Sequence, residues 1–305
     1  MISTREAYGK ALAELGDKYK DVVVLDADLS NATKTIEFKK KFPERFFDIG
    51  IAEQDLIGTA AGFAIAGKIP FASTFAIFAS ERACDQVRNA VAYPKLNVKI
   101  AATHAGITVG EDGASHQALE DIAIMRVIPN MAVCCPSDGV QTRWLIEEAI
   151  KYTGPMYIRL ARPATEEIYS SGTNFELGKG VQHGDGTAAT VFATGVTVSE
   201  ALKAQKILRD DGIDIRVVDI HTIKPIDEEL IIKCAKETDK LISIEDHNII
   251  GGLGGAICEV LCDKYPKKLI RMGIHDEFGQ SGKWDELMQF YGITAEGIVK
   301  EIVAH

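Results

Sequence analysis

Apolar positions along the chain follow two alternating patterns. Stretches with one apolar face at helical spacing, such as 5–19 and 52–67, alternate with short apolar runs bounded by polar residues, such as 21–28. The first pattern predicts amphipathic helices and the second predicts buried strands. Strands that alternate with helices predict an α/β fold with a parallel sheet covered on both faces. We expect further strands at 45–50, 70–75, 97–106, 131–138 and 155–162, and further helices at 79–93 and 139–153.

Residues 163–187 break this alternation. They are rich in Gly, Ser, Thr and charged side chains, and we place an interdomain linker at 166–186. The sequence therefore predicts a first domain over 1–165 and a second, smaller α/β domain over 187–305. In the second domain we expect strands at 188–195, 213–225 and 239–248, and helices at 197–212, 227–238 and 254–265.

Composition limits the classes of partner. The 305-residue chain is 46% hydrophobic, enough for a core in each domain, and its net charge is −10 without any cluster of Lys and Arg. Nucleic acids and anionic membranes are therefore not expected as partners. No apolar run approaches the ~18–20 residues of a membrane span, and the polar N-terminus gives no sign of a secretory signal. The six cysteines form no C-x-x-C pair and are expected to be reduced thiols of a cytoplasmic protein.

Three polar clusters follow predicted strands of the first domain. They are Asp26–Asn31, the segment around Glu53, and the glycine-rich loop 102–117, "ATHAGITVGEDGASHQ". Ligands of open α/β sheets bind beyond the carboxyl ends of the strands. We therefore expect a site at this edge of the sheet, where the loop glycines let the backbone approach a ligand closely.

Taken one by one, these residues leave other interpretations open. Glu53 lies in the first turn of a predicted helix, where the helix dipole alone favours a carboxylate. Phe75 and Phe78 are three apart, a spacing that is common in cores. A lone histidine is usually structural, but His104 and His116 share one loop and have an acid between them. Imidazoles can transfer protons near neutral pH, so this pair favours a functional site.

Three stretches together resemble the transketolase family. They are "DIGIAEQ", "STFAIFASERACDQVRNA" and "THAGITVGEDGASHQALEDIAIMRVIPNM", in this order, and the resemblance continues through "PMYIRLARP" and "VFATGVTVSEALKA". It implies a pyrimidine-binding domain with the thiamine diphosphate fold, followed by a transketolase C-terminal domain. The family's further N-terminal domain, with its G-D-G…N signature for the diphosphate and metal, has no counterpart, because "GDG" occurs only at 184–186, in the predicted linker. The chain thus resembles the C-terminal subunit of a split transketolase.

The resemblance implies a site for thiamine diphosphate. This cofactor reacts through C2 of its thiazolium ring, and its aminopyrimidine must take the imino form, which a carboxylate bonded to ring N1′ favours. Glu53 matches that carboxylate. Phe78, with Phe75 beside it, matches the aromatic platform of the pyrimidine, and Asp28 is assigned to the same cofactor site. Glu81 stands where the family usually has Tyr.

The resemblance also implies a sugar phosphate site. His104 and His116 match the two catalytic histidines of the substrate channel, and Asp112 matches the acid that binds sugar hydroxyls. The family's distal phosphate site uses arginines, whose planar fork can bind two oxygens at once. The matches to that site are Arg5, Ser30 and Arg162, although the loop that carries Ser30 is two residues shorter than usual.

The implied function is transfer of a two-carbon ketol unit from a ketose phosphate to an aldose phosphate, as in the pentose phosphate pathway. The implied partners are an N-terminal subunit, which would hold Mg²⁺ or Ca²⁺, and a second copy of this chain in an α₂β₂ complex; no metal ligand is assigned to this chain. Three alternatives stay open. A deoxyxylulose-phosphate synthase usually has Arg at the position of His104, and a 2-oxo-acid dehydrogenase β subunit lacks the run "GEDGxxHQ". The third is a non-catalytic scaffold partner.

One further stretch, "NIIGGLGGAI", is similar to a dinucleotide-binding loop. Ile257 occupies the third glycine position of G-x-G-x-x-G, so we interpret the stretch as a tight turn into a helix.

Overall fold

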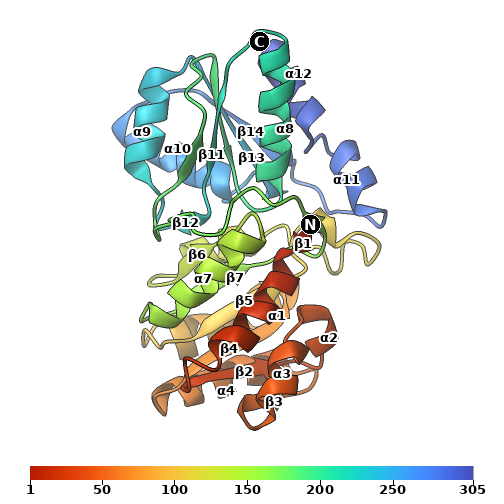
Figure 1. The fold of residues 1–305 in the computed structure, drawn as a ribbon, viewed down its shortest axis with the longest axis vertical. Helices are drawn as coiled ribbons and strands as arrows, with labels where there is room; N and C mark the ends of the chain where they lie inside the picture. The colour runs from red at the N-terminus through yellow and green to blue at the C-terminus, as the bar shows by residue number, and fades with distance from the viewer. Residues whose placement is uncertain (305) are drawn as a thin grey trace.

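The computed structural model describes residues 1–304, which form two α/β units stacked along the long axis of the molecule (Figure 1). The first unit is built on a seven-stranded sheet with strand order β12-β6-β7-β5-β4-β2-β3. All its pairs are parallel except β12 with β6, which confirms the predicted parallel sheet. The strands are β2 (Val22–Asp26), β3 (Phe46–Asp48), β4 (Ile69–Phe75), β5 (Lys99–Thr103), β6 (Ala132–Cys134), β7 (Met156–Arg159) and β12 (Thr222–Lys224).

Helices cover both faces of this sheet because successive side chains of each strand point to opposite sides. In β2, Val22 and Val24 belong to the core cluster under α1, α3 and α7, whereas Val23 and Leu25 belong to the cluster under α4 and α6. The helices are α1 (Thr4–Leu15), α2 (Ser30–Thr33), α3 (Ile36–Lys41), α4 (Glu53–Ile65), α5 (Cys84–Gln86), α6 (Asp121–Val127) and α7 (Gly139–Lys151).

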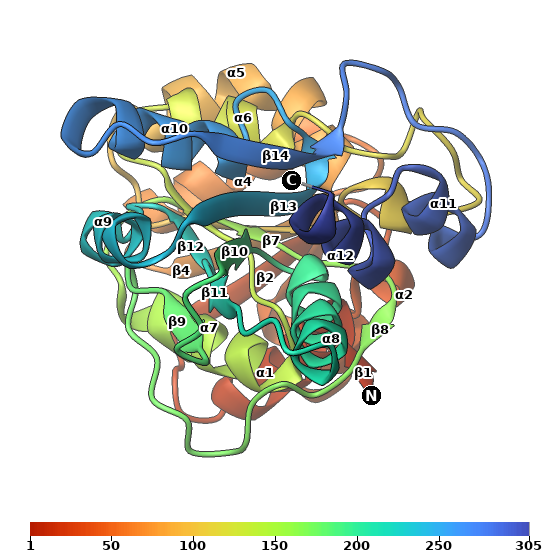
Figure 2. The same cartoon turned by 90° about the horizontal axis from the view of Figure 1, so that it is seen from above.

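The second unit has a five-stranded sheet in the order β14-β13-β10-β11-β9, parallel except for β9. Helices α8, α11 and α12 share one core cluster, and α9 and α10 lie on the other face (Figure 2). The strands are β9 (Val181–His183), β10 (Ala189–Ala193), β11 (Arg216–Asp219), β13 (Lys240–Asn248) and β14 (Leu269–Ile274). The helices are α8 (Thr197–Asp210), α9 (Glu228–Glu237), α10 (Leu253–Lys264), α11 (Trp284–Phe290) and α12 (Ala295–Val303).

The two units are joined more tightly than a simple linker would join them. The predicted strand 213–225 is two strands, because the chain leaves the second sheet after Asp219 and adds β12 to the edge of the first sheet. Strand β9 lies inside the predicted linker and pairs with β11, and β8 (Ala164–Thr165) pairs with β1 (Ile2–Ser3). One apolar cluster also runs from α4 through β6 to α9 and α10, so the units share a core.

The predicted helix 79–93 is irregular. Two π-helical stretches, Phe78–Arg82 and Val87–Ala92, flank the short α5. A π-helical turn holds one more residue than an α-helical turn, so it changes which side chains face the sheet edge. Within residues 1–304, no helix is long and apolar enough to cross a membrane.

Candidate active site

The predicted site residues gather where β2, β4 and β5 end. Strand β4 ends at Phe75 and β5 ends at Thr103, and these two residues are paired neighbours in the sheet. His104 follows at once, and Glu53 begins α4. The carboxyl edge of the parallel sheet therefore brings together segments that lie far apart in sequence, as expected for a ligand site of an open α/β sheet.

Glu53 is the buried carboxylate of this edge. It is 2% exposed, and its Oε2 accepts a hydrogen bond of 2.9 Å from Nη1 of Arg82. The guanidinium carbon of Arg82 also lies 4.4 Å from the ring centroid of Phe78. The charge of Glu53 is therefore balanced by a cation that rests on the proposed aromatic platform. The sequence gives no sign of Arg82 at this site, because its distance from Glu53 depends on the π-helical turn.

Two phenylalanines and two histidines form one aromatic cluster. The rings of Phe75 and Phe78 are nearly parallel, with centroids 5.9 Å apart. His104 stacks on Phe75 with centroids 3.9 Å apart, and His116 meets Phe78 edge-on at 5.5 Å. The cluster brings the predicted cofactor residues into contact with the predicted catalytic histidines. Phe75 is buried, whereas Phe78 keeps part of its surface open to a ligand.

His104 is held in one orientation at the base of the loop. It is 3% exposed, its φ of 58° lies in the left-handed region, and its Nδ1 lies 2.9 Å from Oγ1 of Thr103. Its Nε2 lies 3.3 Å from Nη1 of Arg5. Burial, followed by the charges of Arg5 and Arg162, lowers the pKa of His104 to about 3. The imidazole is therefore neutral at physiological pH.

Arg5 and Arg162 line one cleft of about 330 Å³ between the two units. Burial, and then the charge of Arg162, lowers the pKa of Arg5, so the two cations are close enough to repel each other. Oδ2 of Asp112 lies 3.5 Å from Nη1 of Arg162 and offsets part of this charge. Lys283, which no motif of the sequence marks, lines the same cleft from the second unit. Glu111 and Asp285 also line the cleft, so its three cations outnumber two carboxylates, and this excess of positive charge favours an anionic ligand.

The remaining predicted residues lie beside these groups. Nη1 of Arg5 donates to the carbonyl of Ala32 at 2.9 Å, which places the turn that carries Ser30 next to the cleft. Asp28 is exposed, and its N–H donates to Oδ1 of Asp48. Glu81 keeps much of its surface exposed, but partial desolvation of its carboxyl group, followed by the charge of Glu120, raises its pKa.

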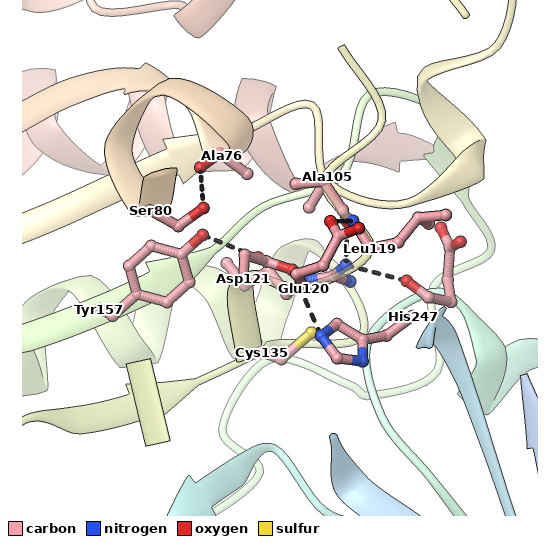
Figure 3. Close-up of polar contacts among 12 residues, drawn as sticks. Ala76, Ser80, Ala105, Leu119, Glu120, Asp121, Cys135, Tyr157 and His247 are labelled. Atoms are coloured by element: carbon pink, nitrogen blue, oxygen red, sulfur yellow. Dashed lines mark hydrogen bonds and ion pairs between the residues drawn. The ribbon is translucent and has the colours of Figure 1, made fainter. Parts of the chain in front are cut away.

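Behind the site lies a buried network that sequence analysis did not identify. Asp121 is fully buried and accepts hydrogen bonds from the hydroxyl of Tyr157 at 2.7 Å and from Nε of Arg159 at 2.8 Å. Figure 3 shows Asp121 between Tyr157 and His247, whose Nε2 lies 3.9 Å from Asp121 Oδ1. Burial lowers the pKa of His247 to about 4, so this residue is neutral. An arginine inside the apolar strand "PMYIRL" was the signal that such a network exists.

The structure explains why the similarity to a dinucleotide loop is misleading. The carboxylate of Glu245 is fully buried and accepts the N–H groups of Leu253 and Gly254 at the start of α10, at 2.6 and 2.8 Å. A Cβ on Gly252 would lie 1.9 Å from Oε2 of Glu245. The helix N-terminus that would bind a phosphate is thus occupied by the protein's own carboxylate.

Metal ligands were not predicted for this chain. Among residues 1–304, no group of three or more His, Cys, Asp and Glu side chains is placed to hold a metal ion. Where the metal of such a site is held therefore stays a prediction.

Comparisons with known proteins agree with this geometry. Residues 1–167 match the pyrimidine binding domain of transketolase, and residues 178–298 match the transketolase C-terminal domain. The chain is 56% identical over 302 residues to a putative transketolase C-terminal section of Methanocaldococcus jannaschii, which covers 98% of this chain and 95% of that protein. It is 42% identical over 296 residues to a 6-deoxy-6-sulfo-D-fructose transketolase subunit, SqwH, of a Clostridium species, which covers 97% and 92% of the two chains.

A solved structure described as a split gene transketolase, inactive beta4 tetramer, superposes on the whole chain and on 98% of its own chain. The TM-score is 0.93 and the sequence identity is 51%. Sequence profile, relatives and fold agree, and the chain belongs to the transketolase family, with the pyrimidine-binding domain followed by the C-terminal domain.

Proposed function

We propose that the chain is the C-terminal subunit of a split transketolase, which moves a two-carbon ketol unit from a ketose phosphate to an aldose phosphate. The observation that carries the proposal is one unbroken series of contacts. It runs from the carboxylate of Glu53 through Arg82 to the rings of Phe78 and Phe75, then to the two loop histidines, and from His104 to Arg5 in the cleft that Arg162 also lines. Glu53 and the phenylalanine rings suit a cofactor, and the cleft with the two arginines suits the anionic end of a substrate. A cytoplasmic location stays part of the proposal, on the cysteine usage described above.

The residues fit the aminopyrimidine half of thiamine diphosphate. This half is flat and apolar on its faces and carries a ring nitrogen that needs a carboxylate, and here a buried carboxylate lies beside a partly open aromatic ring. The bound cofactor would supply the reactive thiazolium carbon. Glu53 would hold the proton at the pyrimidine nitrogen, and Phe78 would orient the ring. Arg82 is 49% exposed and can move aside when the pyrimidine binds.

The remaining residues divide between chemistry and binding. His116 faces Phe78 from the loop and is proposed to transfer protons to the sugar oxygens. Asp112 would bind sugar hydroxyls, and Arg5, Arg162 and Ser30 would bind the distal phosphate. Guanidinium groups bind a sulfonate as well as a phosphate, so the donor panel should include a sulfosugar.

The proposed complex contains an N-terminal subunit with the diphosphate and Mg²⁺ or Ca²⁺ sites. The family's sites form between two units, so we propose a pair of these chains and an α₂β₂ assembly. The alternatives are a deoxyxylulose-phosphate synthase, a 2-oxo-acid dehydrogenase β subunit and a non-catalytic scaffold. His104 and the "GEDGASHQ" run favour transketolase over the first two.

Reconstitution tests the proposal. The purified chain is assayed for ketol transfer with thiamine diphosphate and Mg²⁺, alone and with its N-terminal partner subunit. We expect turnover only with the partner, because this chain contributes only the pyrimidine half of the site. Equal turnover without the partner would contradict the split site, and a mixture that is inactive with every donor would favour the scaffold.

A further inference from the structure

The 104–117 loop rests on the second unit through one buried carboxylate. Asp246, in β13, is 2% exposed. Its Oδ1 accepts the N–H of Ile107 at 2.8 Å, and its Oδ2 accepts the hydroxyl of Thr108 at 2.7 Å. A side chain of the second domain thus holds the first turn of the loop by hydrogen bonds.

The loop backbone at residue 106 lies directly against this carboxylate. Gly106 has a φ of +77°, and a Cβ built on it would lie 2.1 Å from Oδ2 of Asp246. The loop backbone can therefore approach Asp246 only because residue 106 is glycine. The hydrogen bonds and the close approach at Gly106 together fix where the first turn of the loop lies against β13.

The same residue also connects the two ends of the loop. The carbonyl of Asp246 accepts a hydrogen bond of 2.8 Å from Nη2 of Arg159, and this nitrogen also donates to the carbonyl of Ala118 at 3.2 Å. The N–H of Gly106 donates to the same Ala118 carbonyl at 3.0 Å. Both ends of the loop are therefore tied to one point of β13.

A second contact with the same unit holds the far side of the loop. Nε2 of Gln117 donates to the carbonyl of Gln280 at 2.9 Å, and the hydroxyl of Ser281 donates to the carbonyl of Glu111 at 2.6 Å. Val109 lies between the contact of Thr108 with Asp246 and the contact of Glu111 with Ser281, and its carbonyl accepts a hydrogen bond of 2.5 Å from Nη1 of Arg162. The position of Arg162 in the cationic cleft therefore depends on how the loop is held.

We propose that Asp246 is a positioning residue for the sugar phosphate site. It holds Ile107 and Thr108, which set the carbonyl of Val109 and through it Arg162, so the second domain controls binding of the anionic substrate tail. This role rests on the proposed function. Asp246 contacts none of the groups assigned to the cofactor, so it acts on the substrate half of the site.

Two substitutions of Asp246 test whether its hydrogen bonds to the loop matter: one keeps most of them and the other removes them. Asp246→Asn keeps the shape and the two shorter contacts, because its amide can donate to the Thr108 hydroxyl, which in turn can donate to the carbonyl of Ala105 at 3.2 Å; it loses only the long contact of 3.4 Å from the N–H of Thr108. Asp246→Ala removes all three contacts. The control is Thr190→Val, which breaks the buried hydrogen bond of 2.9 Å between Thr190 and Thr238 in the same domain without touching the loop.

In the reconstituted complex, Asp246→Ala should raise KM for a ketose phosphate roughly tenfold, because a displaced Arg162 loses its charge-assisted hydrogen bond to the phosphate, and the loss of such a bond costs about that much. Its KM for hydroxypyruvate should change much less, and Asp246→Asn should stay within about threefold of wild type. Equal KM changes for both donors in Asp246→Ala, or a Thr190→Val variant with the same pattern, would overturn the proposal.

Hydrogen exchange of the chain gives a readout that does not depend on activity. Asp246→Ala should speed amide exchange of the 104–117 peptide at least tenfold, because the Ile107 amide loses its acceptor and the loop loses its anchor. Thr190→Val should leave this peptide unchanged. Unchanged exchange in Asp246→Ala would overturn the inference even if the complex is a transketolase. Faster exchange in a complex without ketol transfer would leave the anchor standing and refute only the proposed function.

Discussion

Nη1 of Arg5 lies 3.3 Å from Nε2 of His104, and this contact determines what each side chain can do. A guanidinium can only donate, so Nε2 of His104 accepts and the ring proton lies on Nδ1, facing the hydroxyl of Thr103. In this arrangement Nε2 cannot give a proton to a substrate. We therefore propose that His104 supports Arg5 in the cleft, while the proton-transfer roles of His104 and His116 both stay predictions.

The lowered pKa of His104 predicts a loss of stability in acid. Its pKa is about 3 in the folded chain against 6.5 ordinarily, so as pH falls below about 6.5 the unfolded state binds the proton first. Between pH 7.5 and 5 the wild type should lose about 2 kcal/mol of unfolding free energy that His104→Asn does not lose. Urea unfolding at both pH values measures this difference. The control is the same substitution at the exposed His275; an equal pH effect in both variants would contradict the assignment.

Arg162→Ala tests the proposed phosphate site. A distal phosphate contact is present in the ground and transition states alike, so its loss should mainly raise KM. We expect a penalty of about 1.5–3 kcal/mol, or roughly 10–150-fold, for a ketose phosphate and little change for hydroxypyruvate. Arg209→Ala, on the exposed face of α8, removes the same charge elsewhere. If Arg162→Ala slowed both donors equally, a structural role would explain Arg162 better.

Glu53→Gln tests the carboxylate at the pyrimidine site. Gln can still accept or donate one hydrogen bond but cannot stabilise a protonated ring nitrogen, so the reconstituted complex should lose roughly 10²–10⁴-fold in kcat. Asp55→Asn is the matched control, because Asp55 is the other acid in the first turn of α4 and is exposed. Helix-dipole stabilisation is shared by both acids, so equal, small effects of the two substitutions would reduce Glu53 to that role.

The sequence predicted the layers of the fold and the edge that carries the site, because both follow from local patterns. The alternation of periods revealed β4 and β5, and parallel strands bring their ends together, so Phe75 and His104 were expected at one edge. The three-residue β12 was not expected on the first sheet, because its pairing with β6 depends on contacts almost ninety residues apart, Thr222 with Cys134.

The partners of the buried polar side chains could not be predicted from the sequence either, because they too lie far apart along the chain. Asp121 accepts from Arg159, which is 38 residues away, and Asp246 accepts from Ile107, which is 139 residues away. Asp121 lies in the third stretch that resembles the family but has no role assigned to it there, and Asp246 lies outside the quoted stretches, so each would be interpreted as a surface charge by composition alone. The π-helical turn that brings Arg82 to Glu53 was hidden too, because its apolar spacing over 79–93 predicts an ordinary helix.

Helix α4 carries the last prediction, which concerns assembly. Gly58, Gly62 and Ala66 are spaced for close packing against another helix, yet all three are exposed, and within residues 1–304 a Cβ on either glycine meets nothing within 4 Å. Ile65, on the same helix, is 75% exposed. If this face packs against a second copy of the chain, Gly58→Ala and Gly62→Ala should weaken association through added bulk. Each should also favour the helix itself by about 0.5–1 kcal/mol, because alanine replaces glycine in a helix interior.

Gly255→Ala in α10 is the control for this helix effect, since a Cβ there meets only Nη1 of Arg126, at an ordinary 3.6 Å. Sedimentation of the chain over a range of concentrations should show the two α4 variants dissociating at concentrations where wild type and Gly255→Ala stay associated. Small residues let two helices approach closely, so one added methyl group should weaken association if the copies meet through α4 and should have no effect if they meet elsewhere. Identical masses for all four proteins at every concentration would place the contact between copies away from α4. The exposed glycines would then be assigned to packing against the N-terminal subunit.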